Sequence, residues 1–142
     1  MIFLDSNILV YATGIHGVGD PRTAVARTIV SADEPYVVSV QVIQEFYDRV
    51  TRGRGGSPAL SRDEALAFIA QWRSFRVEPL DLDLFDLAIR LEARLGYRYW
   101  DCAILAAARA AGCHTLLSED LHHGQAVDGL RIVNPFLEGP AS

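Results

Sequence analysis

Apolar residues in this chain occur in short runs, which alternate with longer stretches where they recur at helical spacing. Met1 to Leu4 is such a run and ends at Asp5, which is typical of a buried strand in a parallel sheet. Tyr36 to Val38 is predicted as a second strand. Further strands are predicted at residues 75–80 and 114–117, and a possible fifth at 131–133.

The stretches between these strands contain helix signals. Ser39 is a favourable N-cap residue, and Val42, Phe46 and Val50 behind it belong to one apolar stripe. Ser61 and Glu64 have the spacing of a capping box, which predicts the start of another helix. Helices are predicted in all at residues 7–12 and 21–32, after Ser39, after Ser61, at 84–95, and from Trp100 to Gly112.

Strands that alternate with helices indicate an α/β fold around a central, mainly parallel sheet of four to five strands. Sheets of this kind place their functional sites beyond the carboxyl ends of the strands. The length of 142 residues suits a single domain, which we place at residues 1–136. We expect residues 137–142 to form a disordered tail.

The sequence contains no apolar run long enough for a transmembrane helix, so we expect no membrane contact. No basic region precedes the apolar residues at the N-terminus, so we expect no signal peptide there. Together these features favour a cytoplasmic protein.

The net charge of −5 argues mildly against broad binding of nucleic acid. All thirteen basic residues are arginines, however, and some of them could form a local track for phosphates. The ordinary alternative is that scattered arginines only keep the surface soluble. The candidates for the phosphate track are Arg22, Arg49, Arg52, Arg54 and Arg98.

Four acidic residues stand where this kind of fold builds its sites. Asp5 ends the first strand, Asp120 follows the fourth strand, and Asp101 lies in the first turn of the last helix. Glu45 lies on the helix after the second strand, away from its apolar stripe. Each has an ordinary explanation by itself, as a helix cap, a dipole partner, a turn residue or an exposed acid.

Taken together, the four acids indicate a metal site. Two carboxylates about 5 Å apart repel each other by roughly 3 kcal/mol at an effective dielectric constant of about 20. A cleft with four of them needs protons or a cation, and Mg²⁺ and Mn²⁺ prefer carboxylate oxygens and water as ligands. A metal bound in this way can activate water and stabilise charge on a transferring phosphoryl group.

Several short motifs resemble one known family. They are Leu-Asp-Ser-Asn at 4–7, Gln-Glu-Phe around Glu45, Trp-Asp-Cys-Ala-Ile at 100–104 and Leu-Ser-Glu-Asp-Leu at 117–121. In this order they resemble the PIN domain and, more narrowly, the VapC toxins of bacterial toxin–antitoxin pairs. The resemblance extends over residues 1–136.

The resemblance implies a three-layer PIN-like fold and an endoribonuclease that depends on Mg²⁺ or Mn²⁺. Asp5, Glu45, Asp101 and Asp120 match the acidic quartet of the family. We expect the three aspartates to hold the metal and Glu45 to orient water or hold a second ion. Asn7 and Ser118 match positions with small polar residues that support the acids.

The resemblance also implies partners. A VapB-like antitoxin would inhibit the nuclease with an unstructured arm, and an arginine of that arm could pair with the acids. Apolar residues of the arm could lie on exposed helix faces near Tyr47, Trp72 and Phe75. The substrate would be RNA, and a homodimer is expected.

Two other functions remain open at this point. The first is a phosphoaspartyl protein, such as a receiver domain or a phosphatase, which also uses a strand-end acid with Mg²⁺. Such proteins ordinarily use a lysine, and this chain has none. The second is a PIN-like domain that serves only as an RNA-binding or scaffold module. Such modules usually lose one or more of the acids, whereas all four are present here.

Overall fold

The computed structural model describes residues 1–53, 55 and 59–137. Nearly all of the predicted domain, residues 1–136, is described. Residues 138–142 of the predicted tail lie outside the described residues. The described residues form the helices α1 (Ser6–Thr13), α2 (Pro21–Ser31), α3 (Val40–Arg52), α4 (Arg62–Trp72), α5 (Leu82–Leu95) and α6 (Tyr99–Ala110). Within the same part of the chain, the strands are β1 (Ile2–Leu4), β2 (Tyr36–Ser39), β3 (Arg76–Glu78), β4 (Thr115–Leu117), β5 (Ala126–Val127) and β6 (Leu130–Val133).

All the strands belong to one sheet, in the order β3-β2-β1-β4-β6-β5. Every pairing is parallel except that of β5 with β6. The prediction of an α/β fold with a mainly parallel sheet is therefore confirmed. The sheet has one strand more than the expected four to five, because the two-residue strand β5 was not predicted.

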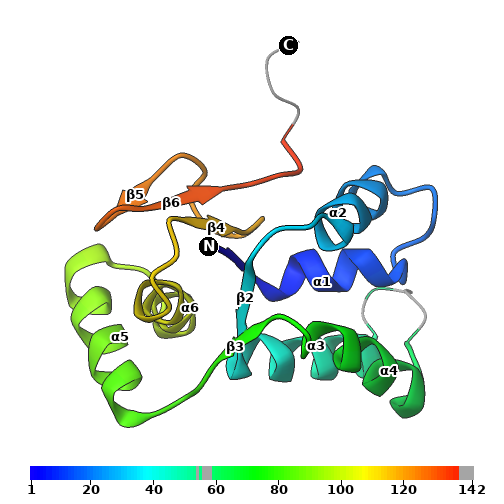
Figure 1. The fold of residues 1–142 in the computed structure, drawn as a ribbon, viewed down its shortest axis with the longest axis horizontal. Coiled ribbons are helices and arrows are strands. Elements are labelled where there is room, and N and C mark those ends of the chain that lie inside the picture. The colour runs from blue at the N-terminus through cyan, green and yellow to red at the C-terminus, as the bar shows by residue number, and fades with distance from the viewer. Residues whose placement is uncertain (54, 56–58, 138–142) are drawn as a thin grey trace.

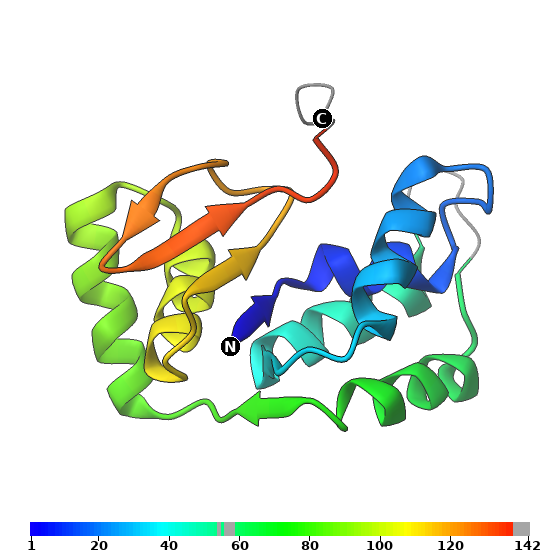
Figure 2. The ribbon, with the colours of Figure 1, turned by 45° about the horizontal axis from the view of Figure 1, so that its top comes forward.

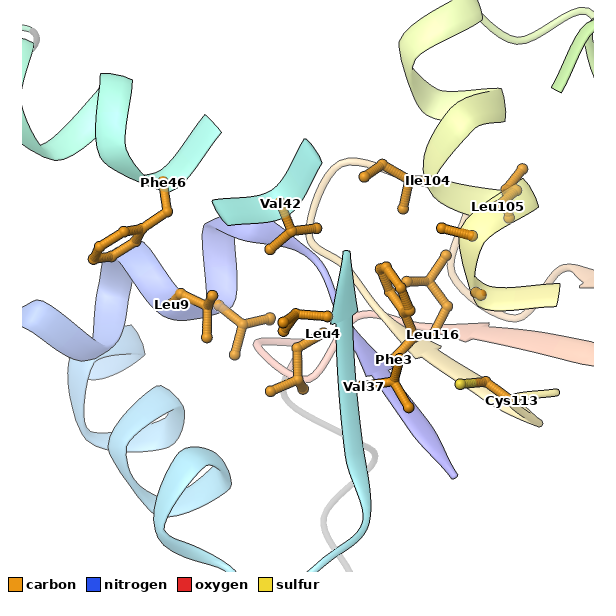
Figure 3. Packing of buried hydrophobic residues seen from close by; sticks show 14 of the residues in the cluster. Phe3, Leu4, Leu9, Val37, Val42, Phe46, Ile104, Leu105, Cys113 and Leu116 are labelled. Carbon is orange, nitrogen blue, oxygen red and sulfur yellow. The ribbon is translucent and has the colours of Figure 1, made fainter. Parts of the chain in front are cut away.

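The helices cover the sheet in two groups. Figures 1 and 2 show α5 and α6 on one side of β1 and β2, and α1 to α4 on the other. Phe3 and Leu4 are adjacent in β1, so their side chains point to opposite faces of the sheet. Figure 3 shows Phe3 on the side of α6 with Leu105, and Leu4 on the side of α1 with Leu9. Residues of both groups are buried, so the core lies in two layers around the central strands.

Two strands lead directly into helices at the same edge of the sheet. Asp5 follows β1 and caps α1, where its side chain accepts a hydrogen bond from the backbone N–H of Ser6. Ser39 ends β2 and caps α3 by accepting from the backbone N–H of Val42. Because β1, β2 and β4 are parallel neighbours, their carboxyl ends meet at this edge, where the site is expected.

The predicted capping box is present at the start of α4. The Ser61 hydroxyl accepts from the backbone N–H of Glu64, and the Glu64 carboxylate accepts from the backbone N–H of Ser61. α5 ends at Gly96, which adopts a left-handed conformation with φ of 74°. Among the described residues, no helix combines the length and the apolar character needed to cross a bilayer.

An aromatic cluster on α3 and α4 corrects one expectation. Trp72 is buried, and its ring packs against Phe46, Phe68 and Phe75 with centroid distances of 5.8, 5.9 and 6.1 Å. An exposed helix face was expected near Trp72, but its side chain is only 2% exposed because α3 packs against α4. Trp72 is therefore part of the core and offers no surface to an antitoxin.

Candidate active site

The first acid of the site is buried at the carboxyl end of β1. Asp5 is only 7% exposed. Its Oδ1 accepts a hydrogen bond of 2.7 Å from the backbone N–H of Ser6, and its Oδ2 accepts one of 2.7 Å from the hydroxyl of Ser118. Both carboxylate oxygens are therefore held in place, so the carboxylate has a defined orientation before any ligand binds.

The protonation of Asp5 is unusual. Burial raises the pKa of Asp5 to about 7, and the negative charges of Glu45 and Asp120 raise it as well. The hydrogen bonds from Ser118 and Ser6 lower the pKa and offset only part of the cost of burial. Near neutral pH, Asp5 is therefore poised between its neutral and its charged form, and a nearby cation would favour the charged form.

The chain after β4 brings Asp120 to the same edge. Asn7 of α1 holds this segment at two points: its Nδ2 donates to Asp120 Oδ2 over 3.2 Å, and its Oδ1 accepts from the backbone N–H of Glu119 over 3.3 Å. The backbone N–H of Asp120 also donates to the Ser118 hydroxyl oxygen over 3.3 Å. The residues predicted as supporting, Asn7 and Ser118, therefore contact the acids directly.

Glu45 is presented by α3, one turn after Gln41. The Gln41 Nε2 donates to Glu45 Oε2 over 3.3 Å and to the backbone carbonyl of Trp100 over 3.2 Å. Burial raises the pKa of Glu45, and the charges of Asp101 and Asp120 raise it further, while hydrogen bonds from Gln41 and Ser6 lower it. Gln41 therefore links Glu45 to the start of α6, where Asp101 lies.

Asp101 lies in the first turn of α6, where the positive end of the helix dipole favours a carboxylate. Its Oδ2 lies 3.6 Å from Nε of Arg98, the residue that precedes the helix. The Arg98 side chain is largely exposed, so this pair contributes little to stability and leaves the guanidinium free to move toward a ligand.

The four acids line one cleft of about 360 Å³, together with Ser6, Asp48, Arg49, Arg98 and Ile104. The acids come from four separate segments: the end of β1, α3, α6 and the loop after β4. With Asp48, five carboxylates face two guanidiniums, so the cleft carries an excess of negative charge. Such a cleft attracts cations.

The model of the PIN domain family matches residues 2–127. This chain belongs to the PIN domain family. The match includes all four acids of the cleft, and the mainly parallel sheet flanked by helices agrees with the fold of that family.

Solved PIN structures have the same fold as this PIN domain. VapC20 from Mycobacterium tuberculosis, a Sarcin-Ricin loop cleaving toxin, is 23% identical with a TM-score of 0.66, over 84% of this chain and 90% of that one. A toxin–antitoxin complex from Klebsiella pneumoniae is 16% identical with a TM-score of 0.71, over 96% and 98%. VapBC2 from Rickettsia felis, bound to a DNA fragment from its promoter, is 17% identical with a TM-score of 0.63, over 93% and 97%. No curated protein sequence matches the chain significantly.

The donor set of this PIN domain suits a hard divalent cation. Among residues 1–53, 55 and 59–137, no three Asp, Glu, His or Cys side chains are grouped as a ready-made coordination sphere. Mg²⁺ does not require one, because it keeps several waters and is usually bound by one or two carboxylates together with substrate phosphates. The carboxylates of the cleft are ligands of this kind, and a cation would offset the unfavourable burial of charged Asp5.

The five candidate arginines of the PIN domain have different surroundings. Arg49 and Arg98 line the cleft, whereas Arg52 pairs with Asp48 over 2.8 Å on the exposed side of α3. Arg22 is engaged by two carboxylates, those of Asp20 at 2.8 Å and Glu119 at 3.0 Å. Arg54 lies outside the described residues.

A network beside the cleft was not predicted from the sequence. The Tyr11 hydroxyl donates to Glu119 Oε2 over 2.6 Å, and Arg22 Nη1 donates to the Tyr11 oxygen over 2.7 Å and to Glu119 Oε1 over 3.0 Å. The Arg22 guanidinium also lies 4.5 Å from the centroid of the Tyr11 ring. Glu119 is thereby anchored next to Asp120. One signal was present in the sequence, since Asn7 and Tyr11 are four residues apart and share a face of α1.

Proposed function

We propose that this PIN domain is an endoribonuclease dependent on Mg²⁺ or Mn²⁺, and that it is the VapC-like toxin of a type II toxin–antitoxin pair. One observation carries the proposal: four carboxylates from four separate segments line one cleft, and the most buried of them is oriented at both oxygens. The family supports the proposal, and the similar structures include toxin–antitoxin proteins.

Asp5, Asp101 and Asp120 are the residues that would hold the cation. When bound, the cation supplies positive charge to the scissile phosphate and acidifies water at the site. Glu45, whose pKa is raised, is suited to orient the attacking water and accept its proton. Ser118 and Asn7 keep Asp5 and Asp120 in fixed orientations, so little reorganisation is needed when substrate arrives.

RNA would approach across the arginines of the cleft rim. Arg49 and Arg98 line the cleft and can contact phosphates next to the scissile bond. Arg52 can extend this track only by releasing Asp48, and Arg54 lies outside the described residues. Arg22 is occupied by Asp20 and Glu119. Contacts to phosphates position a nucleic acid and do not by themselves select a sequence.

The test uses the purified chain and single-stranded RNA with a labelled 5′ end. Attack by water with departure of the 3′ oxygen leaves a 5′-phosphate and a 3′-hydroxyl on the products. We expect such products with Mg²⁺ or Mn²⁺, no cleavage with EDTA, and no cleavage by Asp101→Asn. A 2′,3′-cyclic phosphate would contradict the mechanism. Binding of RNA without cleavage under every metal condition would instead support a non-catalytic module.

A nuclease that attacks the RNA of its own cell requires an inhibitor, and the excess of carboxylates in the cleft suggests how one would bind. An arginine of a VapB-like antitoxin would enter the cleft and pair with these carboxylates in place of the cation. We also propose that the toxin acts in the cytoplasm as a homodimer. Sedimentation of the free chain tests the homodimer independently of its activity.

A further inference from the structure

A second, apolar pocket of about 450 Å³ lies beside the acidic cleft. It is formed where the start of α3 meets the starts of α5 and α6. Its principal lining residues are Gln41, Gln44, Leu82, Phe85, Tyr99 and Trp100. Nothing in the proposed chemistry of the four acids uses these side chains other than Gln41.

The pocket displays aromatic rings to solvent. Trp100 is 59% exposed, although the other tryptophan of the chain, Trp72, is only 2% exposed. The rings of Tyr99 and Trp100 lie edge to face at 5.0 Å, and Phe85 lies 5.8 Å from Tyr99. A cluster of partly exposed aromatic rings next to a polar cleft is a common feature of ligand-binding sites.

One side chain forms the boundary between the pocket and the acidic cleft. Gln41 lines the pocket, and its Nε2 donates both to Glu45 on the cleft side and to the carbonyl of Trp100 on the pocket side. Trp100 also directly precedes Asp101 in the chain. A ligand in the pocket is therefore adjacent to a group bound by the acids.

We infer that this pocket binds an unpaired RNA base next to the phosphate that the acidic cleft holds, through stacking on Trp100. The inference rests on the proposed function and deepens it, because it assigns a subsite to the substrate. A nucleobase has two flat apolar faces that stack on aromatic rings, and RNA-binding proteins use such stacking for unpaired bases.

The polar groups around the pocket match the edges of a base. The amide of Gln44 can both donate and accept hydrogen bonds, as base edges require. Asp81 also lines the pocket; its Oδ1 caps α5 by accepting from the backbone N–H of Leu84, and its Oδ2 can accept from an amino group. Arg98 precedes Tyr99 and Trp100 and has a largely exposed guanidinium, which can hold the backbone phosphate that connects the two subsites. A phosphate itself would not enter an apolar pocket.

Fluorescence tests the stacking without any cleavage. We expect single-stranded oligonucleotides, titrated in EDTA, to quench the tryptophan emission of the wild-type chain, because only Trp100 is accessible. Trp100→Phe should remove the quenching while it retains most of the affinity, since phenylalanine still stacks. Trp100→Ala should weaken binding by roughly 5- to 100-fold, the range for loss of one stacked base. An oligonucleotide with an abasic site at the stacked position should bind wild type and Trp100→Ala equally.

Cleavage gives a second readout with a residue remote from the acids. Phe85→Ala on α5 should raise KM and flatten the base preference at one position beside the cut, while kcat changes little. The matched control is Leu66→Ala, which truncates a similarly exposed apolar residue on α4 and should leave KM and base preference unchanged.

The outcomes separate the inference from the proposed function. If RNA is cut but neither Trp100→Ala nor Phe85→Ala changes affinity or base preference, the inference is overturned and the nuclease assignment stands. If these variants instead change the sedimentation coefficient of the chain, the pocket is an interface with a second copy, and the inference is again overturned. If no condition gives cleavage but the base-dependent quenching is observed, the proposed function fails and the base-binding pocket stands.

Discussion

The hydroxyl of Ser118 donates a 2.7 Å hydrogen bond to the carboxylate of Asp5, from a residue 113 positions away in the sequence. The parallel pairing of β1 with β4 makes this contact possible, because Leu4 and Leu117 are in register and the next residues of the two strands are Asp5 and Ser118. The same hydroxyl oxygen accepts from the backbone N–H of Asp120. One small side chain thus orients two of the acids.

Ser118→Ala is expected to lower kcat/KM by roughly 10- to 100-fold, the range for the loss of a residue that orients a metal ligand. The hydrogen bond from Ser118 lowers the pKa of Asp5, so its removal raises that pKa further. The acidic limb of the activity profile should therefore move to higher pH. The control is Ser74→Ala, which removes a hydroxyl on an exposed turn. An unchanged pH profile in Ser118→Ala would show that the hydroxyl does not act through Asp5.

Asp5→Asn is expected to abolish cleavage and to stabilise the metal-free fold at pH 8. The folded-state pKa of about 7 lies above the ordinary aspartate value of 3.8, so the native state binds a proton more tightly than the unfolded state. Asp5 therefore stabilises the fold at low pH, and this contribution is lost as pH rises through about 7. Between pH 4 and 8 the Tm of the wild type should fall relative to that of the variant, with a final difference of roughly 3–6 °C.

The measurement is thermal unfolding in EDTA across this pH range, with exposed Asp33→Asn as the matched control, which should follow the wild type. Mg²⁺ should raise the Tm of the wild type more at pH 8 than at pH 5, and should have little effect on Asp5→Asn. If Asp5→Asn is instead less stable at every pH, the main role of Asp5 is to cap α1.

Local signals in the sequence were sufficient to predict most of the elements. Asp5 follows one strand and Ser39 ends another, and each caps the next helix, a role that depends only on neighbouring residues. The strand β5 was not predicted because it has two residues. Its one signal was the Asp128–Gly129 turn, where both residues have positive φ, as in a tight hairpin.

The candidate site was predictable as a set of acids but not as a network. The four acids were identified by residue type and position relative to the strands, and the structure places them on one cleft. The contacts of Gln41 with Trp100 and of Tyr11 with Glu119 join segments 59 and 108 residues apart. Such contacts depend on how helices pack on the sheet, which periodicity does not determine. The burial of Trp72 depends on packing in the same way.

The network around Glu119 is expected to position Asp120. Glu119→Ala should weaken the apparent affinity for Mg²⁺ in cleavage about tenfold, because the loop after β4 loses its anchor to Tyr11 and Arg22. Arg22→Ala should have a similar effect. The double variant should lose less than the sum of the two single losses, since both act through one contact. If the main effect of Arg22→Ala is instead a weaker salt dependence of RNA binding, Arg22 belongs to the RNA-binding surface.

The two arginines of the cleft are expected to contact phosphates. Arg49→Ala and Arg98→Ala should each reduce the slope of log affinity against log salt by roughly 0.7, the value for one phosphate of a single strand. Arg52→Ala should have a smaller effect, because Asp48 already neutralises that guanidinium. Arg62→Ala, an exposed arginine on α4, is the control with no expected change. If Arg49→Ala and Arg98→Ala have the same salt slope as this control, neither cleft arginine contacts a phosphate, and both serve only as surface charge.

The proposed antitoxin contact yields a prediction that depends on the cleft alone. A short peptide with one arginine, taken from the C-terminal arm of the proposed VapB-like antitoxin, should inhibit cleavage in competition with Mg²⁺. The guanidinium and the cation cannot both occupy the carboxylates of the cleft, so the apparent inhibition constant should rise as Mg²⁺ concentration rises. Replacing the arginine by glutamine should remove this dependence, and Asp101→Asn should weaken peptide binding measured in EDTA. If inhibition by the peptide is independent of Mg²⁺, the antitoxin acts at another surface, and the nuclease assignment is unaffected.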